Sequence, residues 1–316
     1  MYRIKYFLGV SFLLSVLFVG SCAKQMNVKT EEVTTTNQKN TSGLTDASTC
    51  SPQILFISDR NGNGDIYSYN PISLETKSFA IADSSINDLA YNRYSNTVVF
   101  LQQVSGKKNL YKKDIVSGEV SFLMESPAEE IPAWSPEQNV IAYSKKIGTE
   151  QYSLVIQNLT TQSIQVIYEK ALQPLEPNWS PDGAKLVFTL TDSLNNADIA
   201  IINPDGSDFK NLTKTEKIEG NPSWNPSGEK LLFFRMIDNH ANLFEYVIDT
   251  DELIPLTYGQ KNQFFGKYSS DGSKIVYVGD TDGNWDLFMM NSDGNNKSQL
   301  TFNPAFDGNP IWLPCK

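Results

Sequence analysis

The stretch PNWSPDG at residues 177–183 decides the fold, because it opens a pattern that the chain repeats. It is followed by KLVF (185–188), DIAI (198–201), NPDG (203–206) and NLT (211–213). Pro-Asp-Gly strings form tight reversals, and the apolar runs have the β-branched and aromatic composition of strands. We therefore expect antiparallel strands joined by short turns, with Trp179 beginning an inner strand.

An aromatic residue equivalent to Trp179 recurs at a nearly constant spacing. Successive anchors are 43, 45, 45, 44 and 44 residues apart: Tyr91, Trp134, Trp179, Trp224, Tyr268 and Trp312. The strings PSWNPSG (222–228) and YSSDG (268–272) repeat the opening of the pattern. A period near 44 residues is the length of one four-stranded propeller blade. The sequence predicts an all-β fold, a six-bladed β-propeller.

The two ends of the repeat region complement each other. Residues 307–314 form only the opening of a unit, whereas ILF (54–56) and DIY (65–67) are a continuation without an opening. Together they make one blade, so strands from both termini should close the ring and leave no free edge.

These strings resemble the WD-like repeat of the TolB β-propeller family, and the resemblance covers almost all of residues 50–315. It implies the propeller fold and a cell-envelope binding role, since the TolB propeller binds the peptidoglycan-associated lipoprotein. The same repeat also occurs in sugar-cleaving enzymes and in the non-catalytic part of some peptidases, so fold alone does not give function. We expect two differences from TolB: this chain lacks the N-terminal α/β domain, and it carries a lipid anchor.

The N-terminal segment has the features of a lipoprotein signal. Residues 1–21 carry a short basic start and an apolar run, and VGSC (19–22) resembles a lipobox, in which Cys22 becomes the lipidated first residue. Residues 22–49 are polar and predict a flexible tether, which leaves 50–316 for the propeller. We expect attachment to the bacterial outer membrane through the lipid only, with the domain facing the periplasm or the cell surface.

The formal charge of −10 limits the class of partner. An acidic surface repels nucleic acid and anionic lipid, and most of it is simply solvated. We expect a monomer that binds no nucleic acid and whose partner is an envelope protein or peptide; a protein of the peptidoglycan-associated lipoprotein kind is one candidate.

Two cysteines fall at the same place in the repeat. Aligning Trp312 with Trp179 puts Cys315 at the position of Asp182, and aligning Phe56 with Phe188 puts Cys50 there too. We predict a Cys50–Cys315 disulfide that replaces the missing inner turn and locks the ring, as an oxidising compartment permits. Two free thiols are the alternative.

The segments just before the anchors should gather at one mouth of the central channel. The side chains predicted to bind there are Asp88, Glu129, Glu130, Glu176, Glu219, Asn221, Asp307 and Asn309. Several carboxylates pointing toward one axis would form an acidic funnel for a cationic side chain, a peptide amine or a metal ion. The alternative is that these groups bond the backbone of neighbouring blades or stay hydrated.

Signals for catalysis or a cofactor are weak. The single histidine, His240, is predicted in a loop and no Gly-x-Ser-x-Gly elbow accompanies it, so a nucleophilic triad is not supported. A weak calcium candidate is the set Asp280, Asp282, Asn284 and Asp286. Its glycine is misplaced for an EF-hand loop, and a turn-capping role is favoured because Asp or Asn recurs there in other units. We expect no cofactor.

Two functions are left in competition. The first is a non-enzymatic, membrane-anchored scaffold of the cell envelope that binds another protein. The second is a carbohydrate-binding or carbohydrate-cleaving propeller that uses channel carboxylates, which requires a carboxyl pair about 5 to 9.5 Å apart.

Overall fold

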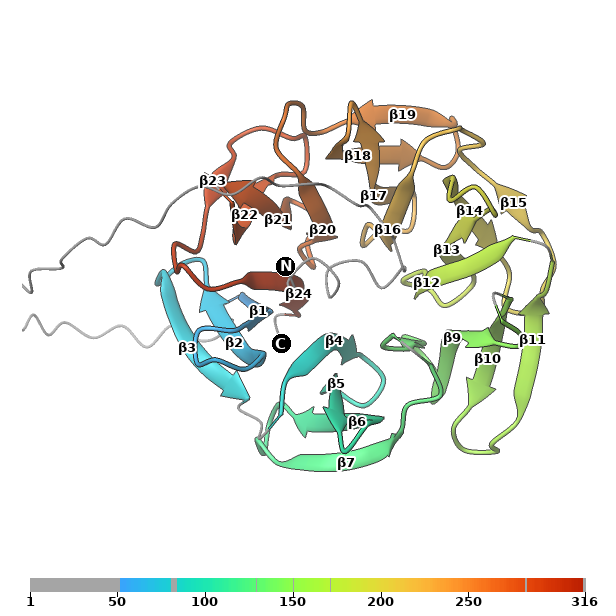
Figure 1. Cartoon of the computed structure of the whole chain (residues 1–316), viewed down its shortest axis with the longest axis horizontal. Coiled ribbons are helices and arrows are strands. Elements are labelled where there is room, and N and C mark those ends of the chain that lie inside the picture. The colour runs from blue at the N-terminus through green and yellow to red at the C-terminus, as the bar shows by residue number, and fades with distance from the viewer. Residues whose placement is uncertain are drawn as a thin grey trace, which may run out of the picture. The chain divides into compact units, whose positions relative to one another are not determined.

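The computed structural model describes residues 52–80, 84–128, 130–149, 151–170, 172–281 and 283–314. These residues fold into six four-stranded antiparallel sheets arranged as a ring (Figure 1). The prediction of an all-β, six-bladed propeller is confirmed. The described part of the chain contains no helix and so no helix able to span a bilayer. The predicted signal peptide and tether (1–49), Cys22 and the Cys50–Cys315 pair lie outside the described residues.

Blade 1 is built from both ends of the described chain. Its strands, from the channel outward, are β24 (Asp307–Leu313), β1 (Gln53–Ser58), β2 (Asp65–Asn70) and β3 (Glu75–Ala80). Strand β24 pairs antiparallel with β1, with Gln53 opposite Leu313 and Ser58 opposite Asp307. The prediction that strands from the two ends close the ring is confirmed.

The other five blades each use four consecutive strands, again from the channel outward. Blade 2 is β4 (Ile86–Asn92), β5 (Thr97–Val104), β6 (Lys107–Asp114) and β7 (Val120–Glu125); blade 3 is β8 (Ala133–Trp134), β9 (Val140–Lys146), β10 (Tyr152–Asn158) and β11 (Ile164–Tyr168). Blade 4 is β12 (Gln173–Trp179), β13 (Leu186–Thr191), β14 (Ala197–Ile202) and β15 (Lys210–Asn211). Blade 5 is β16 (Glu219–Trp224), β17 (Lys230–Ile237), β18 (His240–Val247) and β19 (Glu252–Pro255); blade 6 is β20 (Gln263–Tyr268), β21 (Lys274–Thr281), β22 (Asn284–Asn291) and β23 (Ser298–Gln299).

The anchor aromatic stands at the end of the inner strand, so the expectation that it begins that strand was wrong. Strand β12 ends at Trp179, β16 at Trp224 and β20 at Tyr268. The cause lies in the proline two residues before Trp179 and Trp224, which has no N–H for a ladder and was therefore interpreted as part of a link. Both prolines sit at a β-bulge, where the register of the strand shifts. The segments before the anchors are consequently the channel-lining strands themselves.

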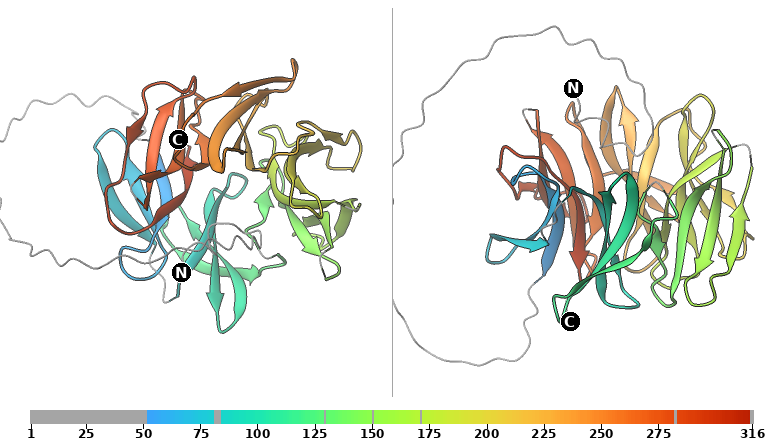
Figure 2. Two further views of the ribbon diagram at one scale, coloured as in Figure 1. Left: turned by 45° about the horizontal axis from the view of Figure 1, so that its top comes forward. Right: turned by 60° about the horizontal axis from the view of Figure 1, so that its bottom comes forward.

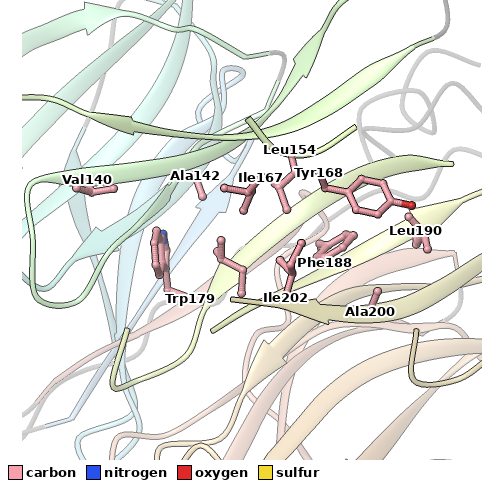
Figure 3. Close-up of a cluster of buried hydrophobic side chains, with 11 residues drawn as sticks. Val140, Ala142, Leu154, Ile167, Tyr168, Trp179, Phe188, Leu190, Ala200 and Ile202 are labelled. Atoms are coloured by element: carbon pink, nitrogen blue, oxygen red, sulfur yellow. The ribbon is translucent and has the colours of Figure 1, made fainter. Parts of the chain in front are cut away.

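Apolar side chains fill the space between neighbouring blades. Between blades 3 and 4, Leu154 and Tyr168 of one blade contact Phe188 and Trp179 of the next, and Leu154 and Phe188 are fully buried (Figure 3). Similar clusters join blades 1 and 2, 2 and 3, 4 and 5, and 5 and 6. Because each strand pair buries both of its faces against adjacent blades, apolar residues appear in runs as well as in alternation.

The anchor indoles also tie blades together by hydrogen bonds. The Nε1–H groups of Trp179, Trp224 and Trp312 donate to the main-chain oxygen just before the anchor of the preceding blade, over 3.2, 3.2 and 3.1 Å. In Trp134 the same buried group has no partner in the described part of the molecule. The seam between blades 2 and 3 therefore lacks this link.

The ring has two faces, and the tilted views of Figure 2 show strands running between them. The front face is defined here as the one where inner strands begin. It carries the hairpins between the second and third strands and the links from each outer strand to the next blade. Hydrogen bonds from Ile86 N to Gly64 O (2.7 Å) and from Asp280 N to Asn262 O (3.0 Å) join these hairpins to those links. The back face carries the remaining turns.

Candidate functional site

The channel is lined by inner strands that share an unusual backbone conformation. The third residue before the anchor has a positive φ in four blades: Glu176 (52°), Asn221 (51°), Phe265 (54°) and Asn309 (49°). A left-handed conformation costs a residue with a side chain about 1–2 kcal/mol, so its recurrence at one position reflects the design of the strand. At each of these positions the strand register shifts by a bulge, which redirects the side chain.

Glu176 is held by the neighbouring blade. Asn221 donates to its two carboxylate oxygens, from the main-chain N over 2.7 Å and from Nδ2 over 2.7 Å, and Thr189 Oγ1 donates over 2.8 Å. Burial raises the pKa of Glu176 above its ordinary value, although these donors favour the charged form. The oxygens of this carboxylate are thus used within the protein.

Asp88 occupies the corresponding position in blade 2. Its Oδ1 accepts hydrogen bonds from the main-chain N of Leu89 (2.8 Å) and from Nδ2 of Asn309 in blade 1 (3.3 Å). Burial raises the pKa of Asp88 to about 6, against the backbone donors and the charge of Lys267, which lower it. Asp88 therefore titrates close to neutral pH.

Lys267 joins these two carboxylates and was missed by the sequence analysis. It lies in blade 6 and interacts electrostatically with both Glu176 and Asp88. Blades 2, 4 and 6 are not neighbours, so the three side chains meet in the channel. Burial lowers the pKa of Lys267, and the two carboxylates oppose this change. The signal was present in the repeat, because the residue before the anchor is uncharged in the other units.

Two of the predicted channel residues are instead buried in ion pairs inside their blades. Glu219 is 1% exposed and accepts from Arg235 over 2.6 Å, with the two residues directly opposite on β16 and β17. Burial raises the pKa of Glu219, and Arg235 opposes the change. Asp307 is fully buried and receives both Arg60 Nη2 contacts, at 2.9 and 3.0 Å. Neither carboxylate is open to a ligand.

The remaining predicted residues are distributed as follows. Asn221 and Asn309 lie in the channel as the donors to Glu176 and Asp88. Glu130 is half-buried and already interacts within the protein, and Glu129 lies outside the described residues. Among the described residues, the channel thus holds two carboxylates, two amides and one ammonium group. This is a mixed polar cluster, less acidic than the funnel that the sequence predicts.

The calcium candidates are used by the blade in the part that the structure describes. Asp286 accepts hydrogen bonds from Thr301 Oγ1 (3.2 Å), Gln299 Nε2 (3.2 Å) and Asn284 Nδ2 (3.2 Å). Asp280 caps the turn by accepting from Gly283 N (3.1 Å), and Asp282 lies outside the described residues. Asp198, which stands in blade 4 where Asp286 stands in blade 6, accepts hydrogen bonds from Thr215 N and Asn211 Nδ2, both at 2.8 Å. These contacts fit the turn-capping interpretation of the position.

Large apolar side chains stand exposed on the front face. They are Ile147 in the β9–β10 hairpin, Leu194 in the β13–β14 hairpin, Tyr258 in the β19–β20 link and Phe302 in the β23–β24 link, with exposed fractions of 46, 79, 77 and 76%. Two hairpins and two blade-to-blade links of the front face therefore each present an apolar side chain to solvent. Such side chains indicate a partner surface only where they gather with other apolar groups.

An aromatic cluster adjoins them at the start of β20. Phe264 lies edge-on to Phe234, with ring centroids 4.9 Å apart, and contacts Phe265 and Trp285 at 6.3 and 5.8 Å. Phe265 takes the place that Glu176, Asn221 and Asn309 hold in other blades. The front face thus combines a polar channel with apolar and aromatic groups around it.

Comparisons with known proteins agree with this architecture. A family model described as the TolB beta propeller domain matches residues 148–315, more than half of the chain. Over 53 residues the chain is 42% identical to the Tol-Pal system protein TolB of Anaeromyxobacter dehalogenans (strain 2CP-C). That match covers 17% of this chain and only 12% of the relative.

Solved structures share the fold at low sequence identity. TolB from Acinetobacter baumannii superimposes with a TM-score of 0.72 at 15% identity, covering 84% of this chain and 68% of that one. An oligogalacturonate lyase in complex with manganese gives a TM-score of 0.54 at 14% identity, covering 78% and 73%. Similarity at this level concerns the fold, which both a binding protein and an enzyme can adopt.

Proposed function

Since this chain belongs to the TolB β-propeller family, we propose that it is a non-enzymatic scaffold of the bacterial cell envelope that binds another protein on its front face. The family supports an envelope role. The observation that carries the proposal is the combination, on the front face, of exposed apolar side chains with the aromatic cluster of Phe264, Phe265 and Trp285; exposed apolar side chains alone also occur on the back face, at Ile72 and Val116.

The chemistry of the contact differs from the acidic funnel that the sequence suggested. Glu176, Glu219 and Asp307 already accept hydrogen bonds from the protein itself. A partner would therefore gain most of its binding energy from burying Leu194, Tyr258 and Phe302, with the polar channel giving orientation. An envelope protein or peptide with an apolar patch fits this surface better than a strongly basic one.

The remaining parts of the proposal concern location. A lipid on Cys22 and a flexible segment up to residue 49 would tether the propeller to the outer membrane, where it would act as a monomer without a cofactor. A partner of the peptidoglycan-associated lipoprotein kind follows from the family alone. Globomycin, which blocks cleavage of lipoprotein precursors, tests the anchor: we expect the precursor to accumulate with its lipid attached, and Cys22→Ser to prevent attachment of the lipid.

Site-specific photocrosslinking in intact cells tests the binding face. A benzophenone amino acid is placed singly at Leu194, Tyr258 or Phe302, and at Ile72 or Val116 on the back face as matched controls, since those two are also exposed (72 and 83%). We expect one envelope protein to be captured, and identified by mass spectrometry, from the front-face positions only. Equal capture from both faces, or none from the front face, would contradict the proposal.

The competing carbohydrate-cleaving function receives less support. It requires two carboxyl groups free to act on a substrate, whereas the described channel carboxylates Asp88 and Glu176 are hydrogen-bonded to neighbouring residues. His240 offers no triad, since its Nδ1 contacts only the carbonyl oxygen of Asp238, two residues away. Turnover of any envelope polysaccharide that disappears in Glu176→Gln would restore this alternative.

A further inference from the structure

A second recess lies at the front of the seam between blades 2 and 3, and hairpins and a link form it instead of the inner strands. It is a cleft of about 480 Å³ bounded by the β5–β6 hairpin, the β7–β8 link and the β9–β10 hairpin. These elements are neighbours in the ring (Figure 1). Sites for small ligands have volumes of about 300–1,000 Å³, so the cleft is large enough for one.

The described lining of this cleft is basic, whereas the chain carries a formal charge of −10. It contains Lys108, Lys145 and Lys146 and no described aspartate or glutamate, and Lys108 already interacts within the protein. The nearby carboxylate of Glu125 is paired with Lys107 at 2.9 Å. A local cluster of cations on an acidic protein concentrates anions from solution.

Two of these lysines are available to a ligand. Lys145 and Lys146 are exposed, and neither makes a hydrogen bond or an ion pair with any residue that the structure describes. Lys107, at the β5–β6 hairpin, is by contrast occupied by Glu125 over 2.9 Å. The ammonium groups of Lys145 and Lys146 are therefore the ones that a ligand in the cleft can meet unpaired.

The rest of the lining suits a saccharide. Tyr152 contributes an aromatic ring that is half-buried, against which the apolar C–H face of a sugar packs. Gln103, Ser126 and Ser144 bring an amide and two hydroxyls to the wall. The two hydroxyls donate to main-chain oxygens, Ser126 to Ala128 (2.9 Å) and Ser144 to Pro174 (2.7 Å), so each keeps lone pairs for the hydroxyls of a ligand.

The walls are fixed by the local backbone. Ser105 and Gly106 both have positive φ (52° and 81°), the conformation of the tight two-residue turn that matches the twist of a hairpin. The β7–β8 link is anchored to the β5–β6 hairpin, because Ser126 N donates a hydrogen bond to Lys108 O over 2.8 Å. A cleft with such walls exists before a ligand arrives, which reduces the entropy lost on binding.

We propose that this cleft is a binding site for an anionic saccharide, in which Lys145 and Lys146 bind the negative group and Tyr152 supports the sugar ring. Nucleic acid is disfavoured by the negative charge of the chain. A protein surface is less well suited, because the lining of the cleft is mostly polar. The cleft lies on the same front face as the proposed protein-binding surface, but its lining does not include Leu194, Tyr258 or Phe302, so either proposal can fail alone.

Isothermal titration calorimetry of the full-length protein tests the site with defined probes. The anionic probe is a hyaluronan tetrasaccharide, the neutral probe is N-acetylchitotetraose and the simple anion is inorganic phosphate. The double variant Lys145→Ala/Lys146→Ala removes the free charges, and Lys214→Ala/Lys217→Ala removes the same charge from another front-face link as the matched control. All four lysines are outside the core, so both variants should fold.

We expect saturable binding of the hyaluronan probe, weakened at least about tenfold in Lys145→Ala/Lys146→Ala and unchanged in the control. Tyr152→Ala should weaken that probe and leave phosphate unaffected. The proposal is overturned if the hyaluronan probe does not bind, if the neutral probe binds equally well, if phosphate alone accounts for the affinity, or if the control variant loses the same amount.

Discussion

At the scale of single residues, two buried carboxylates of the ring are each paired with an arginine. Glu219 faces Arg235 across adjacent strands, and Asp307 pairs with Arg60 of the β1–β2 hairpin. Each arginine also lies over an aromatic ring, Arg60 at 4.4 Å from the centroid of Tyr67 and Arg235 at 5.1 Å from that of Phe244. Losing one member of such a pair leaves the other charge desolvated without compensation.

Glu219→Gln should therefore destabilise the fold strongly. We expect the free energy of unfolding to fall by about 3 kcal/mol or more, because Arg235 is left buried and unpaired. Urea unfolding followed by tryptophan fluorescence measures the change. Lys210→Met is the control: its ion pair with Asp251 is exposed (51 and 62%), so the loss should stay under about 1 kcal/mol. Equal effects in both variants would contradict this account.

Asp88 makes stability depend on pH. Its pKa is about 6 in the folded protein, against about 3.9 for an unperturbed aspartate, so the folded state holds the proton more tightly. Linkage then makes the contribution of this group favourable at low pH and lost as the pH rises from about 4 to about 6. In the same channel, burial raises the pKa of Glu176 and lowers the pKa of Lys267.

The variant Asp88→Asn cannot ionise and should lack this dependence. Its stability relative to the parent protein should rise between pH 4 and pH 7, whatever the absolute effect of the substitution at either value. Urea unfolding at several pH values gives the difference directly. A difference that stays constant across this range would show that Asp88 titrates normally in the fold.

At the scale of elements, blades are held to one another by strand ends as well as by apolar packing. The indole of Trp179 donates across the seam to Ala133 O, whereas Trp134, which is equally buried at 9% exposure, has no such acceptor in the described residues. The two tryptophans differ in this one hydrogen bond and are otherwise close equivalents in the repeat.

Replacing each by phenylalanine isolates the indole hydrogen bond. Both variants lose similar contact area, but Trp179→Phe also loses a donor and leaves a carbonyl unpaired. We expect Trp179→Phe to cost about 1 kcal/mol more than Trp134→Phe in chemical unfolding. If the two variants unfold at the same denaturant concentration with the same slope, the link between blades contributes nothing measurable.

At the scale of the whole molecule, the two ends of the propeller close the ring. Strand β24 completes blade 1 by pairing with β1, so the inner and second strands of one sheet come from opposite ends of the propeller. Only one residue separates Leu313 from Cys315, and two separate Cys50 from Gln53, the residue that faces Leu313. The register of the described strands is therefore compatible with the predicted Cys50–Cys315 disulfide.

This disulfide would add to the closure made by hydrogen bonds. In the chain-entropy model a bond that closes so long a loop stabilises by up to about 5 kcal/mol. Cys315→Ser should lower the unfolding free energy of oxidised protein and have no further effect under reducing conditions. Peptide mapping without reduction gives the pairing itself: recovery of an alkylated Cys50 peptide from folded protein would end the idea.

The sequence alone determined the number of blades, their four-stranded design and the closure by both ends. These follow from local rules, since a 44-residue period with turn residues at fixed offsets specifies each blade without reference to the others. The same locality explains the error over Trp179: a proline inside a strand at a bulge has the sequence signature of a link.

Only the tertiary structure decided which polar residues meet. Asp88, Glu176 and Lys267 come from alternate blades, and no periodic signal joins them. Glu219 and Asp307 lie in inner strands equivalent to the one that carries Glu176, but each pairs with an arginine of its own blade. The β-bulge in these strands turns the residues before and after it in different directions. The lysine cleft between blades 2 and 3 depends likewise on three elements that only the ring brings together. Contacts between distant segments are set by packing of whole blades, which a repeat describes on average and a structure shows residue by residue.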